Sequence, residues 1–445
     1  MIIVPKNIVT VDSKERILKN HFVEIENGRI VSIKKNNENY FAKNKKRVLR
    51  FDNLTLIPGF VQTHIHLCQT LFRGLADDLE LLDWLQLKIF PYENAHNKNS
   101  LLASVRLGIN ELFLSGTTTL LDMGTLRHQE VIFEELQSSG IRAIAGKCLI
   151  DKNDLFPQFK SDTKSELKEI NQLAKSYHNA SSGKIKYGFA PRFVLSCSEK
   201  LLKESFEMKK DFPGSLYHTH SSENKNEIAE VKRRHKKENI EYFDSIGVID
   251  DHSVLAHCIH VNDKETELLK KKNVRVAHCP SSNLKLGSGI ANIPKYLKKG
   301  ISVSLGADGA PCNNNLSIFN EMRLAALIQK PIHGSTIMDA KTVFKLATIE
   351  GAKALHLQKE IGSIEVGKKA DLVLMDLNSN SHSISVSDDS IYSNIVYSSS
   401  SDSVNSVMVE GEWKVLNKKS LLYDQNELNQ TSKDELKKLL RRDEK

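Results

Sequence analysis

The chain contains a pair of histidines, His64 and His66, shortly after an apolar run at residues 56–61. If this run is a β-strand, residues i and i+2 point to the same face, so both imidazoles face the same way. Two neutral imidazoles on one face of a strand end can form half of a metal site. An isolated pair of exposed or hydrogen-bonded histidines would have the same sequence, so the rest of the chain must supply the other ligands.

Further polar side chains lie at or just after the ends of other apolar runs. They are His218 and His220, then Glu223, His257, His278 and Asp308. A metal that activates water needs three or four nitrogen or oxygen ligands and one open position. Two histidines from one strand, one from a second and an aspartate from a third would supply that set.

Some of these residues also have purely structural interpretations. His218 and His220 share one strand face, so either could be the ligand, although His220 lies closer to the strand end. His278 could simply end its strand before Pro280, and Asp308 could be a turn residue. The metal interpretation therefore requires that the strands close into one barrel.

The centre of the chain alternates short apolar runs with amphipathic stretches, as expected for alternating strands and helices. The candidate strands lie at residues 60–66, 117–122, 143–149, 186–190, 216–220, 254–257, 275–278 and 302–305. The amphipathic stretches include residues 166–177, 227–237, 265–272 and 316–329. This pattern predicts an α/β fold with a parallel (β/α)₈ TIM-type barrel. Catalytic side chains of such barrels lie at the C-terminal ends of the strands, where the polar residues above are found.

The two ends of the chain resemble each other in pattern. Residues 1–57 contain short β runs, with Asn27-Gly28 as a hairpin signal. Similar runs return near the C-terminus, at residues 370–375, 404–409 and 413–416. We expect one small β-sandwich domain built from residues 1–57 plus 360–422, around a catalytic barrel at residues 58–359.

Two C-terminal stretches have a different composition. Residues 379–403 are rich in serine and predict a loop that contains one strand at residues 395–397. Residues 423–445 are strongly charged and predict a peripheral tail that is helical at most.

Composition excludes several classes of protein. The net charge of +8 over 445 residues comes from lysines spread along predicted helices, without interleaved aromatic residues, so no nucleic-acid partner is expected. The cysteines show no C-x-x-C spacing, which favours a reduced, cytoplasmic compartment. No apolar run approaches the roughly 20 residues that span a bilayer, so no membrane partner is expected.

Eight sequence blocks, in order, carry a resemblance to a known family. They are PGFVQTHIH, LFRGLADDLELLDWL, GTTTLLDMG, HTHSSEN, LAHCIH, HCPSSNLKLGSGIA, LGADGAPCNNN and IGSIEVGKKADLVLMDL. The similarity that they mark covers nearly the whole chain, from about residue 1 to residue 418. The chain resembles the amidohydrolase superfamily, and most of all its branch of purine and nucleoside deaminases and s-triazine chlorohydrolases.

The resemblance implies a role for each strand-end residue. One divalent metal per chain, zinc or iron, would be held by His64, His66, His220 and Asp308. His257 would orient the attacking water, Glu223 would carry a proton to the ring nitrogen, and Asp308 would also act as a base. No lysine suitable for carboxylation ends the fourth strand, so a mononuclear site is expected. A homo-oligomer, either dimer or tetramer, is a further expectation from the resemblance.

The substrate signals divide between two classes of purine. The resemblance assigns substrate contacts to Gln69, Trp84, Glu93, Arg192 and Glu223. The blocks around Trp84 and Asp308 look like deaminases of 5′-deoxyadenosine, methylthioadenosine and S-adenosylhomocysteine, which is the interpretation we favour. Gln69 and Arg192 look like guanine deaminases, and a triazine or another heterocycle is a further alternative. A non-catalytic binding module without metal would have lost ligands, and none of the ligand residues is missing.

Overall fold

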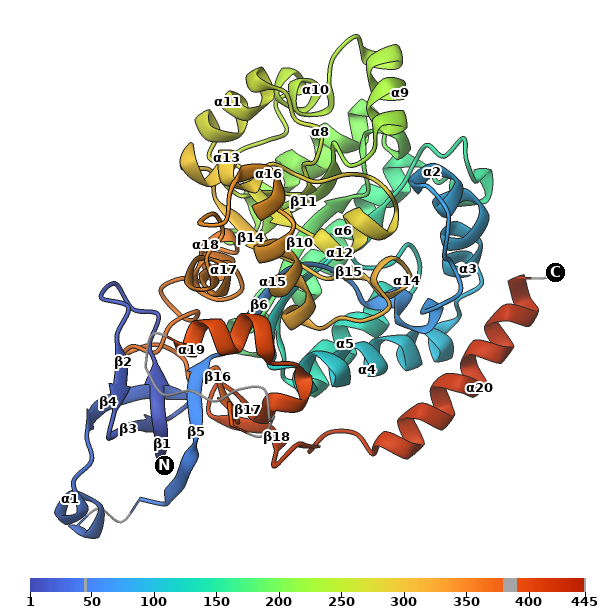
Figure 1. Ribbon diagram of the computed structural model, residues 1–445. Coiled ribbons are helices and arrows are strands. Elements are labelled where there is room, and N and C mark those ends of the chain that lie inside the picture. Colours follow the sequence, from blue (N-terminus) through green and yellow to red (C-terminus); the bar gives the residue numbers. More distant parts are fainter. Residues whose placement is uncertain (44–45, 379–389, 444–445) are drawn as a thin grey trace.

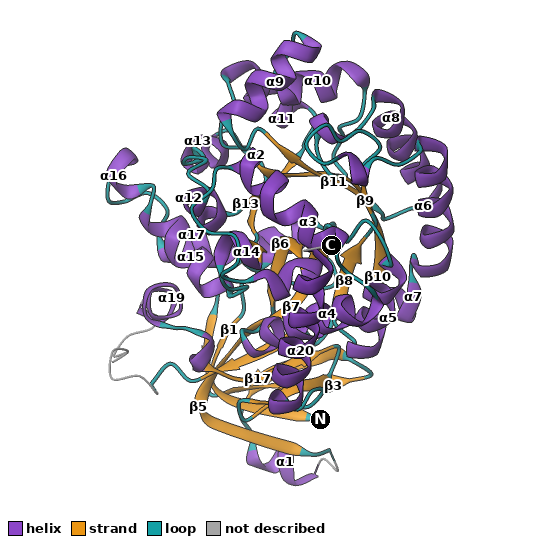
Figure 2. Ribbon diagram, turned by 90° about the vertical axis from the view of Figure 1, so that its right-hand side faces the viewer, coloured by secondary structure: helices purple, strands orange, loops and turns teal. Residues whose placement is uncertain are grey.

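A computed structural model describes residues 1–43, 46–378 and 390–443, and its strands form two sheets (Figure 1). One sheet is the parallel barrel in the centre of the chain. The other combines strands from both ends of the chain and lies against one side of the barrel (Figures 1 and 2). The sequence analysis predicted this division, and the fold class is confirmed.

The barrel strands lie close to their predicted positions. They are β6 (Phe60–His66), β7 (Thr117–Asp122), β8 (Arg142–Ala145), β9 (Cys148–Leu149), β10 (Ile185–Pro191), β11 (Leu216–Ser221), β12 (Ser253–His257), β13 (Arg275–His278), β14 (Val303–Leu305) and β15 (Asp308–Gly309). Each neighbouring pair is parallel, in the order β14-β13-β12-β11-β10-β8-β7-β6-β15. β14 and β15 follow each other closely and together form the eighth barrel strand. Because β14 pairs with β13 and β15 pairs with β6, this eighth strand joins both edges of the sheet and closes the barrel.

Helices surround the barrel strands (Figure 2). The longer ones are α4 (Lys98–Leu114), α5 (Gln129–Ser139), α6 (Thr163–Tyr177), α8 (Glu199–Met208), α9 (Lys225–His235), α10 (Asn239–Ile246), α11 (Asp263–Lys271) and α15 (Ile318–Leu327). Shorter ones include α12 (Pro280–Lys285), α13 (Ile293–Lys298), α14 (Ala310–Asn313), α16 (Lys330–His333), α17 (Ala340–Leu346) and α18 (Ile349–Ala354). The predicted amphipathic stretches correspond to α6, α9, α11 and α15.

The terminal sheet has the order β19-β18-β17-β16-β5-β1-β3-β4, with β2 paired to β1. Its strands are β1 (Ile2–Val9), β2 (Ile17–Lys19), β3 (His21–Glu26), β4 (Arg29–Lys35), β5 (Val48–Pro58), β16 (Leu372–Met375), β17 (Val404–Val409), β18 (Glu412–Leu416) and β19 (Lys419–Ser420). The predicted Asn27-Gly28 hairpin joins β3 to β4, and both of its residues have positive φ, as a type I′ turn requires. A short helix, α1 (Glu38–Lys43), precedes β5.

A buried ion pair ties the terminal sheet to the barrel. Arg142, at the start of β8, donates hydrogen bonds to Asp371 at 2.9 and 3.2 Å, and both residues are buried. The paired geometry satisfies both charges, as burial of an ion pair requires. The end of the barrel opposite to the catalytic strand ends is thereby fixed to β16.

Two C-terminal predictions are revised by the structure. Residues 395–397 do not form a strand: they lie in a π-helical turn, η6 (Asn394–Ser398), which continues α19 (Ser390–Ser393). Ile395 and Val396 pack into the main core, so their burial, and not pairing with a sheet, explains their apolar character. The part of the serine-rich loop at residues 379–389 lies outside the described residues.

The charged tail forms a long helix, α20 (Gln425–Asp443), which packs along α4 (Figure 2). Leu439 of α20 is fully buried among Phe72, Tyr92 and Ala103. Arg442 donates hydrogen bonds to the backbone oxygen of Ala95 at 2.8 Å and to Ser100 Oγ at 3.1 Å. The tail is therefore part of the folded structure on its inner face. In the described part of the chain, no helix is long and apolar enough to cross a membrane.

Candidate active site

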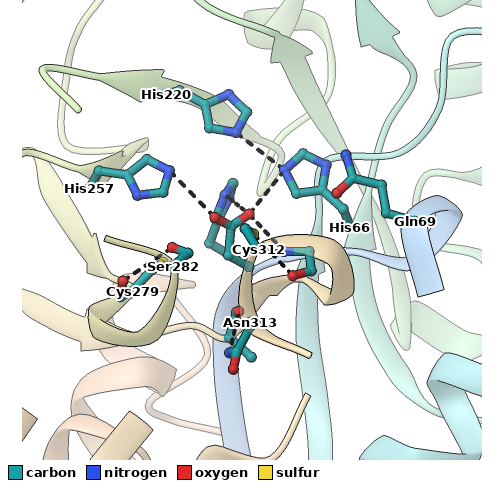
Figure 3. Close-up of polar contacts among 12 residues, drawn as sticks. His66, Gln69, His220, His257, Cys279, Ser282, Cys312 and Asn313 are labelled. Carbon is teal, nitrogen blue, oxygen red and sulfur yellow. Dashed lines mark hydrogen bonds and ion pairs between the residues drawn. The ribbon is translucent and has the colours of Figure 1, made fainter. Parts of the chain in front are cut away.

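The strand ends bring imidazole and carboxylate groups together at one end of the barrel. The Nε2 atoms of His64 and His66 lie 3.2 and 3.4 Å from Asp308 Oδ1. His66 Nε2 also lies 3.2 Å from His220 Nε2. His257 Nε2 lies 3.9 Å from Asp308 Oδ2, and Figure 3 shows the rings of His66, His220 and His257 turned toward one another. We call these five residues the polar floor of the site.

Backbone geometry at the ends of two strands allows this convergence. Gly306 lies where the eighth strand passes β6, and a Cβ at this position would lie 2.6 Å from the backbone oxygen of His64. Only glycine permits so close an approach. His257 and Asp308 both have positive φ, of 71° and 61°. Left-handed backbone in non-glycine residues is costly and clusters at functional sites, which is consistent with a functional role for this end of the barrel.

Each of three floor histidines is oriented through its other ring nitrogen. Nδ1 of His64 lies 2.8 Å from His218 Nε2, and Nδ1 of His220 lies 2.6 Å from the backbone oxygen of Arg192. Nδ1 of His257 lies 2.8 Å from Asn283 Oδ1. Such contacts fix the tautomer and ring orientation of a metal-ligating histidine.

The floor residues present a donor set that a divalent metal could occupy. One ligand atom from each of His64, His220, His257 and Asp308 lies within 4.8 Å of the other three. Beyond their proximity to the carboxylates of Asp308 and Glu223, Nε2 of His64 and Nε2 of His257 are buried without a hydrogen-bond partner among the described residues. Burial, and then the neighbouring His64, lowers the pKa of His66 and of His220 well below the usual range, so both imidazoles are in the neutral form that binds metal. The residues therefore fit a metal ion held by nitrogen and oxygen ligands.

The pKa values of two carboxyl groups, one in the floor and one beside it, are shifted in opposite directions. Burial raises the pKa of Glu223 well above its usual range, and the charges of Asp308 and Glu227 raise it further. Burial alone would also raise the pKa of Asp308, but the proximity of His64 and the other imidazoles holds it well below its usual range. Two carboxylates with separated pKa values can serve as proton donor and proton acceptor in one reaction.

The position of Glu223 is set by the start of α9. Asn224 caps this helix, and Glu227 Oε2 accepts hydrogen bonds from the backbone N–H groups of Glu223 and Asn224 at 2.9 and 3.3 Å. This arrangement is a capping box, which fixes the entry of the chain into the helix. The Glu223 side chain then reaches the floor, with Oε2 lying 3.5 Å from His257 Nε2.

A buried polar network lies beside the floor. Arg192 Nη1 and Gln69 Nε2 each donate a hydrogen bond of 2.7 Å to a different oxygen of Glu93. All three residues are at most 5% exposed, and Gln69 Oε1 has no hydrogen-bond partner among the described residues. Gln69 lies in η1 (Leu67–Phe72), directly after β6, and Glu93 lies in α3 (Phe90–Asn94). Gln69 Oε1 is therefore an unpaired hydrogen-bond acceptor beside the floor.

The floor opens into a cavity. Its other side is formed by Leu81, Trp84, Leu85, Phe193 and Leu286, which we call the apolar roof. The first three residues come from α2 (Leu81–Trp84) and the π-helical turn η2 (Leu85–Ile89). Trp84 Nε1 is buried without a hydrogen-bond partner among the described residues, so it can donate to a bound molecule.

The structure brings most of the sequence-predicted residues to this one cavity. Its lining includes His66, Gln69, Trp84, Arg192, His220, Glu223, His257 and Asp308. His64 lies below them, and Glu93 contacts the cavity through Gln69 and Arg192. His218 does not reach the cavity but contacts His64 from the layer below.

Other residues depart from expectation or were missed. His278 is fully buried with neither ring nitrogen hydrogen-bonded among the described residues, and burial lowers its pKa to about 3. Asn283, which orients His257, and the roof residues Leu81, Leu85, Phe193 and Leu286 were not singled out from the sequence. Apolar side chains carry no chemical signal in a sequence, and Asn283 becomes informative only when α12 is placed beside β12.

The chain is similar in sequence to proteins of one known family. The model of the amidohydrolase family matches residues 55–414. A "5-methylthioadenosine/S-adenosylhomocysteine deaminase" of Thermococcus sibiricus is 36% identical over 392 residues, which is 88% of each chain. A "5'-deoxyadenosine deaminase" of Methanosphaera stadtmanae is 37% identical over 382 residues, covering 86% of this chain and 87% of the relative.

The fold has solved counterparts as well. The crystal structure of an adenosine deaminase from Xanthomonas campestris with bound zinc superposes with a TM-score of 0.90 and 27% identity, covering 99% of this chain and 98% of that chain. The match of the family model over most of the chain, together with these relatives, identifies the protein at the level of its family. The chain belongs to the amidohydrolase family.

Proposed function

We propose that this protein is a metal-dependent hydrolytic deaminase of a purine nucleoside, and that its substrate is an adenosine modified at the 5′ position. The observation that carries the proposal is the placement of two carboxylates around one imidazole. Glu223 Oε2 and Asp308 Oδ2 lie 3.5 and 3.9 Å from His257 Nε2, at the bottom of the cavity. Relatives named as deaminases of 5′-modified adenosines, at 36 and 37% identity, support the substrate class.

One divalent metal, most simply zinc, would be held by His64, His66, His220 and Asp308. When bound there, it would lower the pKa of a water molecule toward neutrality and supply a hydroxide-like nucleophile. The zinc bound to the structurally similar adenosine deaminase supports this choice of metal.

The protein side chains then account for the proton transfers. His257, fixed through Asn283, orients the water toward the amino-bearing ring carbon. Asp308 accepts a proton from this water, and Glu223 donates a proton to the adjacent ring nitrogen as the carbon–oxygen bond forms. The proton held by Asp308 passes to the amino group, the carbon–nitrogen bond breaks and ammonia leaves, while the proton of the added hydroxyl returns to Glu223 as the ring carbonyl forms. The products are the corresponding inosine and one ammonia per water consumed.

A panel of purines and pyrimidines tests the proposal. Ammonia release would be measured with zinc-loaded protein and 5′-deoxyadenosine, 5′-methylthioadenosine, S-adenosylhomocysteine, adenosine, guanine and cytosine. We expect fast release from the 5′-modified adenosines and slow or no release from guanine. Fast release from guanine alone would overturn the substrate assignment and favour guanine deaminase, the alternative suggested by Gln69 and Arg192.

The homo-oligomer and the reduced compartment stay predictions. The cysteines are all free and buried, which is consistent with a reduced compartment. Size-exclusion chromatography with light scattering would measure the oligomeric state.

A further inference from the structure

A second group of potential metal ligands lies at the end of the barrel opposite to the polar floor. Asp251 and His252 come directly before β12, whose other end carries His257, and His356 lies just after α18. One ligand atom from each of Asp251, His252 and His356 lies within 4.8 Å of the other two. We call these three residues the distal cluster. None of them lines the active-site cavity, so the reaction proposed above does not use them.

The side chains of the distal cluster are spaced much like those of the polar floor. Nδ1 of His252 lies 2.9 Å from Asp251 Oδ1, and the rings of His252 and His356 stack with their centroids 4.0 Å apart and their planes at 10°. In the polar floor, Nε2 of His66 lies 3.2 Å from Nε2 of His220. Two ligand atoms at about 2.0–2.1 Å from one tetrahedral zinc ion are roughly 3.3 Å apart. Both groups of residues therefore come close to the spacing that a metal ion requires.

One ring of the distal cluster is oriented by the backbone, as a metal ligand usually is. His356 Nε2 lies 2.7 Å from the backbone oxygen of Asp251. Because a carbonyl oxygen only accepts, Nε2 carries the proton, and Nδ1 of the neutral ring has a lone pair. His220 of the polar floor has the same kind of contact, with Nδ1 lying 2.6 Å from the backbone oxygen of Arg192. The side chains of His252 and Asp251 are 35% and 51% exposed, so water can complete a coordination sphere.

The protonation states of the distal cluster suit a cation. Burial lowers the pKa of His356 below its ordinary value, which favours the neutral ring. Burial alone would raise the pKa of Asp251, but the hydrogen bond with His252 and nearby positive charges hold it below its ordinary value, so the carboxylate is ionised. Among the described residues, no lysine or arginine forms an ion pair with Asp251, and Lys209 is bound by both oxygens of Asp250 at 2.7 and 2.5 Å. The carboxylate of Asp251 can therefore bind a metal ion.

We propose that the distal cluster is a second metal site, which binds zinc through Asp251, His252 and His356, with water as the fourth ligand. Two imidazoles and one carboxylate suit zinc or another transition metal better than magnesium or calcium, which prefer oxygen ligands. The ion joins the start of β12 to the segment after α18, which are 105 positions apart in the chain, and so stabilises the folded barrel. The inference does not depend on the proposed function, because the distal cluster is at the other end of β12 from His257.

Equilibrium dialysis of the metal-free protein against zinc tests the proposal, with the bound metal measured by inductively coupled plasma mass spectrometry. We expect two zinc ions per chain, of which the second binds more weakly because its ligands are partly exposed. His252→Gln and His356→Gln each remove one ligand. Each should weaken the binding of the second zinc at least about tenfold and leave the first in place, since even the loss of a group that only orients a ligand costs this factor. Magnesium should not occupy the distal cluster.

His333→Gln is the matched control, because His333 is an exposed histidine of α16 outside both groups of ligands. This variant should bind two zinc ions. One zinc ion per chain in the unmodified protein at about 100 µM free zinc, or a second zinc ion retained in both distal variants, would overturn the inference and leave the proposed function standing. Binding of a second zinc ion that the two substitutions abolish, without ammonia release from any nucleoside, would overturn the proposed function and support the inference.

Discussion

The polar floor and the apolar roof face each other across the same cavity but differ in how they are built. The floor consists of side chains from the ends of β6, β11, β12 and β15, which the barrel hydrogen bonds hold in register. The roof comes mostly from α2, η2 and the segment after β10, and its residues belong to a separate apolar cluster. In the proposed function, the reaction therefore depends on the rigid strands, whereas the choice of substrate depends on helical and loop segments that can vary.

The substitution with the largest expected effect is Asp308→Asn, at the floor. The amide neither accepts a proton from water nor serves as an anionic ligand, so we expect kcat to fall by at least about 10⁴-fold for every substrate. Ammonia release and metal content would be measured together. Activity within tenfold of that of the unmodified enzyme would contradict the assignment of the floor as the place where the reaction occurs.

Glu223→Gln separates proton donation from metal binding. The amide cannot donate an acidic proton, so we expect kcat to fall about 10²- to 10⁴-fold while the metal content stays at the level of the unmodified enzyme. Inductively coupled plasma mass spectrometry on the purified variant checks the metal. Unmodified turnover in this variant would remove Glu223 from the reaction.

Trp84→Phe probes the roof. Phenylalanine keeps most of the apolar surface but lacks the unpaired Nε1–H, so one hydrogen bond to substrate is lost. At about 0.5–1.5 kcal/mol for such a bond, kcat/KM should fall about two- to tenfold, chiefly through KM. A hundredfold loss in kcat with unchanged KM would show instead that the roof takes part in the chemical step, and the contrast with the floor would fail.

Leu439→Ala tests the support that the C-terminal helix gives to the polar network beside the floor. Leu439 is fully buried against Phe72 and Tyr92, which lie in η1 and α3, the segments that carry Gln69 and Glu93. Truncation should lower the free energy of unfolding by about 2–5 kcal/mol, and KM should rise severalfold at most. Leu421→Ala, at a leucine that is 55% exposed, is the matched control and should change stability by less than about 0.5 kcal/mol. Equal effects of both substitutions on stability, measured by urea denaturation, would contradict the role of α20.

Much of the floor could be predicted from the sequence because its chemistry is local to strand ends. Histidines two residues apart on an apolar run share a face, and the repeated strand–helix alternation places every strand end at the same edge of the barrel. Apart from Trp84, the roof could not be predicted in this way, since its leucines and its phenylalanine resemble ordinary core residues in a sequence. The same ambiguity of short apolar runs explains the wrong strand at residues 395–397, which pack as a helical turn.

The C-terminal helix α20 has a helical pattern of apolar residues that is only weakly visible in the sequence. Leu428, Ser432, Glu435 and Leu439 are the buried residues of α20 and follow the helical period, but charged residues dominate the segment. Composition therefore favoured a peripheral tail, whereas the periodicity of a few residues indicates a packed helix. Its contact with α4 joins residues more than 300 positions apart, which no local pattern reveals.

The central claim is that the polar floor holds a single divalent metal on which deamination depends. The most direct measurement is a titration of metal-free protein with zinc, in which bound metal and ammonia release from 5′-methylthioadenosine are followed together. The account predicts no turnover without metal and a linear rise in activity that ends at about one equivalent per chain. Turnover in the metal-free protein, or activity that appears only after a second equivalent has bound, would contradict it.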